Sequence, residues 1–176
     1  VPISVYHKTK MIAERNFLSY SDKMQIHCIR PAIVCGMSPK MRLNVSVNIL
    51  TYQAIKNKKI TVFGDEQTTP NIHIKDMANK YQHCLNNQDV PSSCYNASFE
   101  DLKMIEIAKM IQQVTDSEIE VSESNDSRSY RQDSSKLLAT GFTPQFGVKH
   151  AIDEIDIAYQ KEELEDWDNC YTVKWM

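Results

Sequence analysis

Apolar residues follow two alternating periodicities along the chain, one typical of strands and one typical of helices. Short apolar runs rich in β-branched residues predict strands in "MQIHCIRPAIVCG", "KITVFG", "SCYNAS" and "EIEVS". Pro31 breaks the first run and Gly36 closes it, and we expect one buried parallel strand there.

Helical spacing of apolar residues separates these runs. The predicted helices cover the segment of Tyr6 and residues 43–57, 77–87, 101–114, 134–140 and 149–161. We expect Asp76 to cap the helix over 77–87, with Met77, Tyr81 and Cys84 on its inner side. The alternation predicts an α/β fold with parallel strands, although the strands are few for a free-standing doubly wound sheet.

Composition limits the possible functions. The chain has 176 residues and a net charge of -3, with acidic and basic residues mixed, which favours one domain and no nucleic-acid partner. Without an apolar run long enough to span a bilayer or a signal-peptide pattern, we expect a cytoplasmic protein with no membrane partner. The five cysteines have no CxxC spacing, which favours reduced thiols over disulfides or zinc ligands.

Candidate chemistry begins at the start of the chain, where "YHKTK" places Tyr6 four residues before Lys10. On a helix this spacing puts both side chains on one face, and a lysine ammonium favours the phenolate form of a nearby tyrosine. The pair therefore suits proton transfer. The alternative is an amphipathic surface pair at a chain terminus.

An ordered series of motifs follows this pair. "IRPAIVCG", "ITVFGDEQTTPNIHIKDMA", "YNASFEDLKMIEIAKMI" and "SRSYRQDSSKLLATGFTP" occur in that order. From Tyr6 to about Ile152 the chain resembles the second half of the extended short-chain dehydrogenase/reductase family, specifically the NAD-dependent nucleotide-sugar epimerases and dehydratases. The resemblance implies the C-terminal part of a Rossmann-type doubly wound fold together with a small substrate-binding α/β domain. Residues 1–36 would be a remnant of the NAD-binding domain, and residues 37–176 would be mainly the substrate-binding domain with interleaved Rossmann elements.

The resemblance also implies roles for individual residues. Tyr6 would be the general acid/base, and Lys10 would support the phenolate and bind the nicotinamide ribose of NAD, which exchanges hydride with a sugar carbon. Pro31, Ala32 and Val34 match positions beside the nicotinamide, at the carboxyl end of a strand. For Ala32 and Val34, a place in a core strand is compatible with this role.

Further residues match substrate positions of the family. Asn48 falls on the helix that closes over the nucleotide, and Val62 and Phe63 match the strand that flanks the base. Phe63 either stacks on the base or belongs to the core. Arg42 and Arg128 are candidates for the diphosphate of a nucleotide sugar, because a guanidinium binds phosphate oxygens bidentately, and the alternative for each is a solvated arginine.

The first helix is also a predicted interface. The resemblance implies a homodimer through this helix, and we expect Met11, Leu18 and Phe17 to lie on the flank opposite Tyr6 and Lys10. The alternative is that this helix covers the chain's own sheet.

The sequence departs from the family pattern at several points. Thr69 stands where most members have an arginine, and the spacing of His73 and Asp76 favours a strand end and a helix cap over a metal site. The chain has only four glycines, so the glycine-rich dinucleotide fingerprint is absent. We therefore expect a fragment that lacks the first Rossmann half and is inactive alone. The alternative function is a nucleotide-sugar binding or dimerisation module without catalysis.

Overall fold

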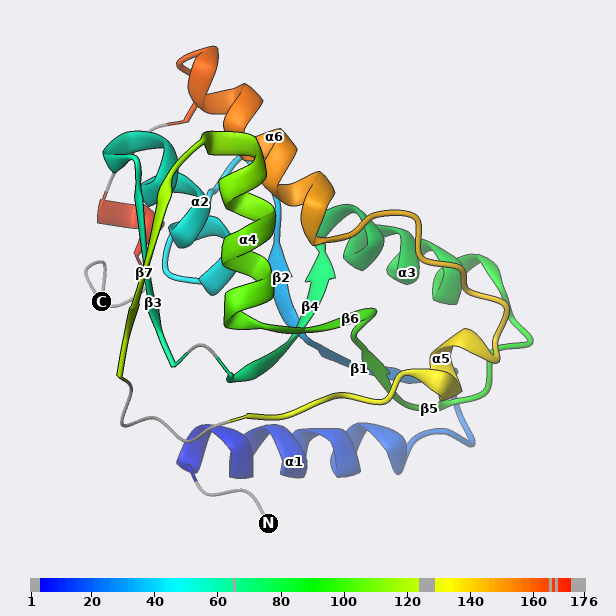
Figure 1. Cartoon of the computed structure of the whole chain (residues 1–176). Helices are drawn as coiled ribbons and strands as arrows, with labels where there is room; N and C mark the ends of the chain where they lie inside the picture. Colours follow the sequence, from blue (N-terminus) through cyan, green and yellow to red (C-terminus); the bar gives the residue numbers. More distant parts are fainter. Residues whose placement is uncertain (1–3, 65, 124–128, 165, 167, 172–176) are drawn as a thin grey trace.

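The computed structural model of the chain describes residues 4–64, 66–123, 129–164, 166 and 168–171. The helices are α1 (Val5–Leu18), α2 (Ser46–Asn57), α3 (Ile74–Asn86), α4 (Met104–Thr115), α5 (Ser135–Leu138) and α6 (Val148–Gln160), with a short 3-10 helix, η1 (Asp168–Cys170). The strands are β1 (His27–Pro31), β2 (Ile33–Cys35), β3 (Lys59–Phe63), β4 (Thr68–His73), β5 (Ser93–Ala97), β6 (Glu100–Lys103) and β7 (Glu118–Ser122). This order confirms the predicted α/β class (Figure 1).

The described strands form small sheets in which parallel pairing prevails. Strand β1 pairs with β5, β2 with β4, and β3 with β7, each in parallel, while β6 joins β4 in an antiparallel pair. Parallel neighbours need a crossover connection, and α2 and α3 provide such connections here. The predicted parallel strands are therefore confirmed.

The predicted single strand before Gly36 is wrong, because the chain changes sheet at Pro31. Strand β1 ends at Pro31 and β2 begins at Ile33, and the two pair with different partners. A proline has no backbone N–H and cannot continue a ladder as a donor. The backbone N–H of Ala32 still donates to Ala97 O at 2.9 Å, so the change of sheet occurs directly after the β1·β5 pair.

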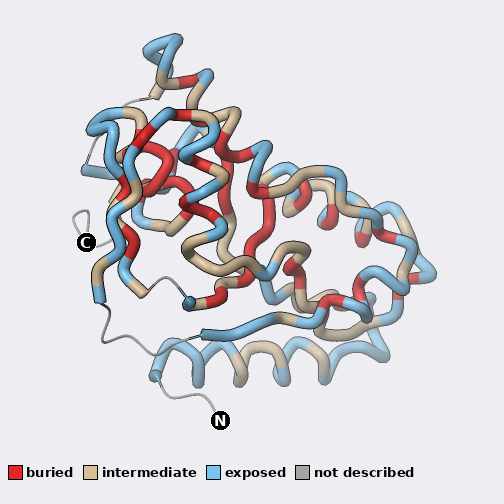
Figure 2. The backbone as a smooth tube through the Cα atoms, in the orientation of Figure 1, coloured by how far each residue is buried: buried red, intermediate tan, exposed pale blue. Residues whose placement is uncertain are grey.

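The largest core cluster lies between α2, α4, α6 and the strand β3. Its fully buried residues come from all four elements, and Figure 2 colours the backbone of buried residues in this part red. They include Val47, Ala54, Ile60, Val62, Ile107, Ala108, Ile111, Val148, Ala151 and Ile152. Burial of a valine or isoleucine side chain contributes on the order of 1.5–3 kcal/mol, so this cluster is the main source of stability.

Two smaller clusters complete the core. One joins β4, β5 and α5 through Ile72, Tyr95, Ala97 and Leu137. The other seats η1 against α2 and α6, where the backbone N–H of Leu43 donates to Cys170 O at 2.9 Å.

Helix α3 differs from its prediction at its start and along its inner side. Its N-cap is His73, whose ring nitrogen Nδ1 accepts from the N–H of Lys75 at 3.1 Å. Asp76 is instead a buried residue of the first turn, and its carboxylate accepts from the backbone N–H groups of Gln145 and Phe146 at 2.9–3.1 Å. The long-range contact explains why a local capping rule selected the wrong residue.

The inner side of α3 is also more polar than its sequence predicts. Asp76, Lys80 and Cys84 are buried, whereas Tyr81 is 47% exposed. Tyr81 is therefore not an inward residue, and its ring covers the buried Lys80 ammonium at 3.6 Å from Nζ to the ring centroid.

Helix α4 begins later than predicted, because residues 100–103 form strand β6. The short strand is added to β4 through antiparallel pairs such as Thr69 with Leu102. This pairing is long-range, and the helical spacing of the apolar residues gives no sign of it.

Candidate active site

The first helix lies across the sheet formed by β1 and β5 and runs opposite in direction to β1 (Figure 1). One ion pair fixes its place: Arg30 donates through two nitrogens to the carboxylate of Glu14, at 2.8 and 2.6 Å. Glu14 lies two helical turns after Tyr6, a rise of about 12 Å. Tyr6 and Lys10 are therefore directed past Arg30, toward the carboxyl end of β1.

The two candidate catalytic side chains lie together on α1. The ammonium Nζ of Lys10 is 5.4 Å from the centroid of the Tyr6 ring, and the ring of His7 lies against Tyr6 at 5.6 Å between centroids. Tyr6 is 65% exposed, so its hydroxyl is open to a ligand approaching from outside the chain. The arrangement can deliver or accept a proton at a surface that the rest of this chain leaves uncovered.

The structure describes every residue of α1, and none of them is buried. Met11 and Leu18 are half-buried, and they share a helix face with Glu14, which holds the helix to β1. These two residues therefore line the inner side of α1, whereas Tyr6 and Lys10 are exposed. The outward apolar residues are Ile12 and Phe17, which are 62% and 59% exposed.

The carboxyl ends of β1 and β5 are crossed by the segment 129–134. The Gln132 side chain donates to Arg30 O at 2.9 Å, and Ser134 Oγ accepts from the N–H of Ser98 at 2.8 Å. Pro31 is exposed at the end of β1, while Ala32 is half-buried beside it. This edge of the parallel pair is the location where open α/β sheets bind ligands.

Val34 and Gly36 follow in β2 and the loop after it. Val34 packs on the cluster that contains Ile72. Gly36 has φ +104°, and a Cβ added there would lie 2.8 Å from Nε2 of the His73 ring. Only glycine permits both this backbone conformation and the close approach of the histidine.

His73 pairs with Glu154 in the interior beside Gly36. Nε2 of His73 lies 3.3 Å from Oε2 of Glu154, and the histidine side chain is fully buried. Burial lowers the pKa of His73, partly offset by the Glu154 charge. Burial alone raises the pKa of Glu154, but the hydrogen bond and the charge of Lys75 bring it below its usual range. The pair joins α6 to the end of β4, and among the described residues no cluster of three or more His, Cys, Asp or Glu is placed to hold a metal.

Asn48 is buried, and both ends of its amide are used within the chain. Its Oδ1 accepts from the N–H of Gly36 at 3.0 Å, and its Nδ2 donates to Arg42 O at 2.9 Å. Asn48 thus holds the loop between β2 and α2 in place. The Arg42 guanidinium is exposed on that loop and donates to Asn44 Oδ1 at 2.8 Å.

The remaining substrate candidates separate by burial. Val62 is completely buried in β3, while the adjacent Phe63 is 61% exposed. Phe63 is therefore not a core aromatic and has a free ring face for stacking. Arg128 lies outside the described residues.

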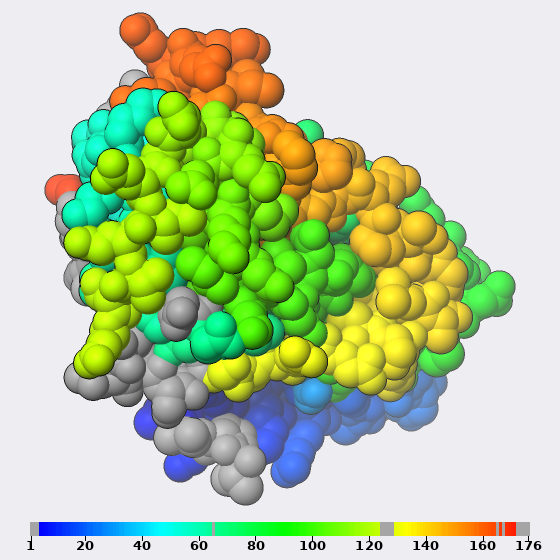
Figure 3. Space-filling model, viewed as in Figure 1, coloured from blue at the N-terminus to red at the C-terminus, as the bar shows by residue number. Residues whose placement is uncertain are grey.

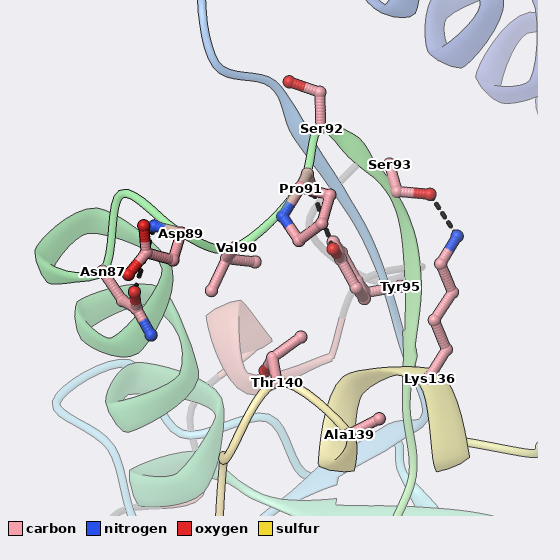
Figure 4. A pocket seen from close by; sticks show the side chains of 10 residues that line it. All are labelled: Asn87, Asp89, Val90, Pro91, Ser92, Ser93, Tyr95, Lys136, Ala139 and Thr140. Atoms are coloured by element: carbon pink, nitrogen blue, oxygen red, sulfur yellow. Dashed lines mark hydrogen bonds between the residues drawn. The ribbon is translucent and has the colours of Figure 1, made fainter.

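A hollow of about 450 Å³ lies at the opposite, amino end of β5 (Figure 4). It is lined by Asn87, Asp89, Val90, Pro91, Ser92, Ser93, Tyr95, Lys136, Ala139 and Thr140. Its polar groups are largely occupied with one another: Lys136 bonds Ser93, and the Tyr95 hydroxyl donates to Pro91 O at 2.7 Å. The hollow is separated from the candidate active site by the length of β5.

Sequence reasoning did not identify Glu14, Gln132 or Ser134, although each helps to build the candidate site. Each acts on a residue more than 15 positions away in the chain. Neither a motif nor a periodicity marks such contacts.

Solved enzyme structures share this fold. RMD from Pseudomonas aeruginosa, complexed with NADPH, matches with a TM-score of 0.78 and 17% identity over 92% of this chain and 58% of its own. UDP-N-acetylglucosamine 4-epimerase from Bacillus cereus matches with a TM-score of 0.75 and 22% identity over 95% of this chain and 57% of its own. The dTDP-glucose 4,6-dehydratase from Bacillus anthracis, in complex with NAD, matches with a TM-score of 0.76 and 18% identity over 97% of this chain and 56% of its own.

No family model matches the sequence. At these identities the similarity to solved structures establishes the fold that the chain shares with NAD-dependent epimerases and dehydratases. The chain spans a little over half the length of the enzymes it matches. Among the described helices, none is both long and apolar enough to cross a membrane.

Proposed function

We propose that this chain is the C-terminal catalytic and substrate-binding portion of an NAD-dependent nucleotide-sugar epimerase or dehydratase. The observation that carries the proposal is the position of Tyr6 and Lys10 on α1, beside the carboxyl end of β1, within a fold shared with such enzymes over more than nine-tenths of the chain. The division into a Rossmann remnant over 1–36 and a mainly substrate-binding part over 37–176 belongs to the same proposal.

The residues of this chain fit one end of NAD. Pro31 and Ala32 offer a strand end for the nicotinamide, and the exposed Lys10 ammonium is free to bond ribose hydroxyls. NAD, when bound, takes up and returns a hydride at the sugar carbon. The four glycines of the sequence form no pyrophosphate-binding turn, so that part of the cofactor site requires residues outside this sequence.

Within this proposal Tyr6 exchanges the proton of a sugar hydroxyl, and Lys10 places a positive charge beside the tyrosine ring. Phe63 offers an exposed ring for the nucleotide base, next to Val62, which is buried and fixes the strand. Arg42 and Arg128 are the candidates for the diphosphate. Asn48 acts as a positioning residue, because it holds the loop that carries Arg42.

The direct test is Tyr6→Phe in a complete enzyme, in which a dinucleotide-binding half precedes this chain. Loss of the hydroxyl should reduce turnover roughly 10²- to 10⁴-fold and leave substrate affinity nearly unchanged. Tyr20→Phe is the matched control, because Tyr20 is also an exposed tyrosine, 46% accessible, just beyond α1. Turnover of Tyr6→Phe within threefold of the parent would exclude the tyrosine as the acid/base.

We also propose that α1 forms the contact of a homodimer. Dimerisation is the alternative function if the chain has no catalytic role. Ile12 and Phe17 expose apolar surface on a helix that is held to its own chain by a polar pair. Replacing both by Lys should convert a dimer to a monomer in light scattering without loss of circular dichroism. If the unaltered chain is already monomeric at high concentration, this proposal is wrong.

A further inference from the structure

Two cysteines face each other across the parallel pair of strands that supports α1. Cys28 of β1 and Cys94 of β5 are direct register partners, and both are half-buried. Side chains of register partners on adjacent strands point to the same side of a sheet. The next partners, Ile29 and Tyr95, belong to the core cluster on the other side, so the two thiols point toward α1.

The ion pair that holds α1 surrounds these thiols with charge. Arg30 lies two residues after Cys28, on the same face of β1, and binds Glu14. The Glu14 carboxylate lies close enough to Cys94 for its negative charge to raise the pKa of that thiol. The two sulfur atoms therefore share a small region between the sheet and the inner side of α1.

The spacing of the strands suits a covalent link. Neighbouring strands lie about 4.8 Å apart, and disulfides join residues whose Cα atoms are about 4.4–6.8 Å apart. We propose that Cys28 and Cys94 form a reversible cross-strand disulfide with a low-molecular-weight disulfide as the oxidant, a redox latch between β1 and β5 beneath the candidate catalytic helix. This inference does not depend on the proposed enzymatic function.

The chemistry is two successive thiol–disulfide exchanges. One protein thiolate attacks the small disulfide, forms a mixed disulfide and releases one small thiol. The second protein thiolate then attacks the sulfur of the first cysteine and releases the other small thiol. Two protein thiols are thus oxidised to one disulfide, and one small disulfide is reduced to two thiols.

The other cysteines have different surroundings. Cys35 is buried in β2 with its thiol on Ile72 O at 3.5 Å, and burial raises its pKa to about 12. Cys84 and Cys170 are buried in α3 and η1. A small disulfide reaches a half-buried sulfur more easily than a buried one, so oxidation should select Cys28 and Cys94.

The test equilibrates the purified 176-residue chain with mixtures of oxidised and reduced glutathione, followed by blocking of free thiols and peptide mapping without reductant. We expect a peptide pair joined between Cys28 and Cys94, and a rise of roughly 5–15 °C in the midpoint of thermal unfolding. Cys28→Ser and Cys94→Ser should each abolish both effects, whereas Cys84→Ser should retain them. If the unaltered chain carries only glutathione adducts at these positions, or joins other cysteines equally well, the proposal is wrong.

Two charge variants distinguish the effect of nearby charges on disulfide formation from the effect of exposing the two thiols. Burial raises the pKa of the Cys94 thiol first, the Glu14 charge raises it further, and Arg30 lowers it. Glu14→Gln and Arg30→Gln both break the ion pair that holds α1, but they change the charge beside the thiols in opposite directions. At pH 7, Glu14→Gln should speed bridge formation, and Arg30→Gln should slow it, each by about 2- to 10-fold. Equal acceleration by both would show that loosening of α1, and not the charged setting of the pair, controls the reaction.

Discussion

Helices α1 and α4 are of similar length and are held in opposite ways. The 12-residue α4 buries Ile107, Ala108 and Ile111 in the main core, whereas the 14-residue α1, described throughout, buries no residue. Figure 3 shows α4 and α6 packed into one continuous surface, with α1 below and behind it. This chain therefore separates stability from candidate chemistry: the packed helices stabilise the fold, and Tyr6 and Lys10 lie on a helix held mainly by Arg30 and Glu14.

The sequences of the two helices explain this difference. In "MIEIAKMIQQVT" the apolar residues gather on one face, which can be buried against a sheet and neighbouring helices. In "VYHKTKMIAERNFL" they are spread around the helix, and no face is apolar enough to be buried fully. The exposed apolar residues of α1 are therefore available to a ligand or to another protein surface.

The largest expected effect comes from equivalent truncations in the two helices. Ile111→Ala removes a fully buried side chain and should lower the free energy of unfolding by about 2–5 kcal/mol. Ile12→Ala removes a side chain that is 62% exposed and should change it by less than about 0.5 kcal/mol. Chemical denaturation of both variants measures the contrast, and similar losses would show that α1 is part of the main cooperative core.

Burial of the charged Lys80 side chain lowers the stability of the fold. Its side chain is fully buried, with Nζ 3.3 Å from Met77 Sδ, and burial lowers its pKa from 10.5 to about 8. The folded state therefore binds the proton more weakly than the unfolded state, a penalty of about 3 kcal/mol when both are protonated. Lys80→Met should remove this penalty and stabilise the chain by up to that amount at pH 7.

The sign of the pH dependence distinguishes this cause from better packing alone. Below about pH 8 Lys80 is protonated in both the folded and the unfolded state, and the whole penalty is present. Between about pH 8 and 10.5 the folded state has lost this proton and the unfolded state keeps it, so the penalty decreases as the pH rises. The advantage of Lys80→Met should therefore shrink across this window. Lys109→Met, at an exposed position of α4, is the control and should have little effect at either pH. An advantage that stays constant from pH 7 to 10.5 would contradict a charged Lys80.

The smallest effect on global stability should come from the ion pair of α1. Glu14→Gln removes a partly exposed pair, which is worth at most about 1 kcal/mol, so the midpoint of unfolding should scarcely move. Amide hydrogen exchange should nevertheless accelerate in residues 5–18 and remain unchanged in α4. Unchanged protection of α1 would show that its half-buried residues Met11 and Leu18, and not Arg30, hold the helix.

The same interaction has a defined pH dependence. The hydrogen bond from Arg30 holds the pKa of Glu14 below its usual range, so its stabilising contribution is present above pH 4.5 and is lost as the pH falls through the lowered value. The protection of α1 should decline in acid before that of α4.

The sequence predicted the elements whose apolar pattern is local, and the structure confirms most of them. The strands "KITVF", "SCYNA" and "EIEVS" and the helices α2 and α6 follow from periodicity alone. The division of strands among sheets did not follow, because it depends on pairs such as Ala32 with Ala97. The cap of α3 was assigned wrongly for a similar reason, since Asp76 is held by residues 145 and 146.

The candidate site was predictable only in part. The spacing of Tyr6 and Lys10 places them on one helix face, and the structure brings them together there. Their roles stay predictions, as do those of Pro31, Ala32 and Val34. The internal hydrogen bonds of Asn48 and the exposure of Phe63 depend on tertiary packing, which no local pattern encodes.

The most direct test of the proposed function is calorimetric titration of this chain with NAD and with UDP- and dTDP-sugars in parallel. Since the sequence has no glycine-rich turn for the cofactor pyrophosphate, we predict binding of NAD no tighter than about 1 mM, or about -4 kcal/mol. At least one nucleotide sugar should bind roughly tenfold more tightly than NAD, with loss of that advantage in a variant carrying Phe63→Ala and Arg42→Gln. Micromolar binding of NAD, or no preference for any nucleotide sugar, would contradict the account.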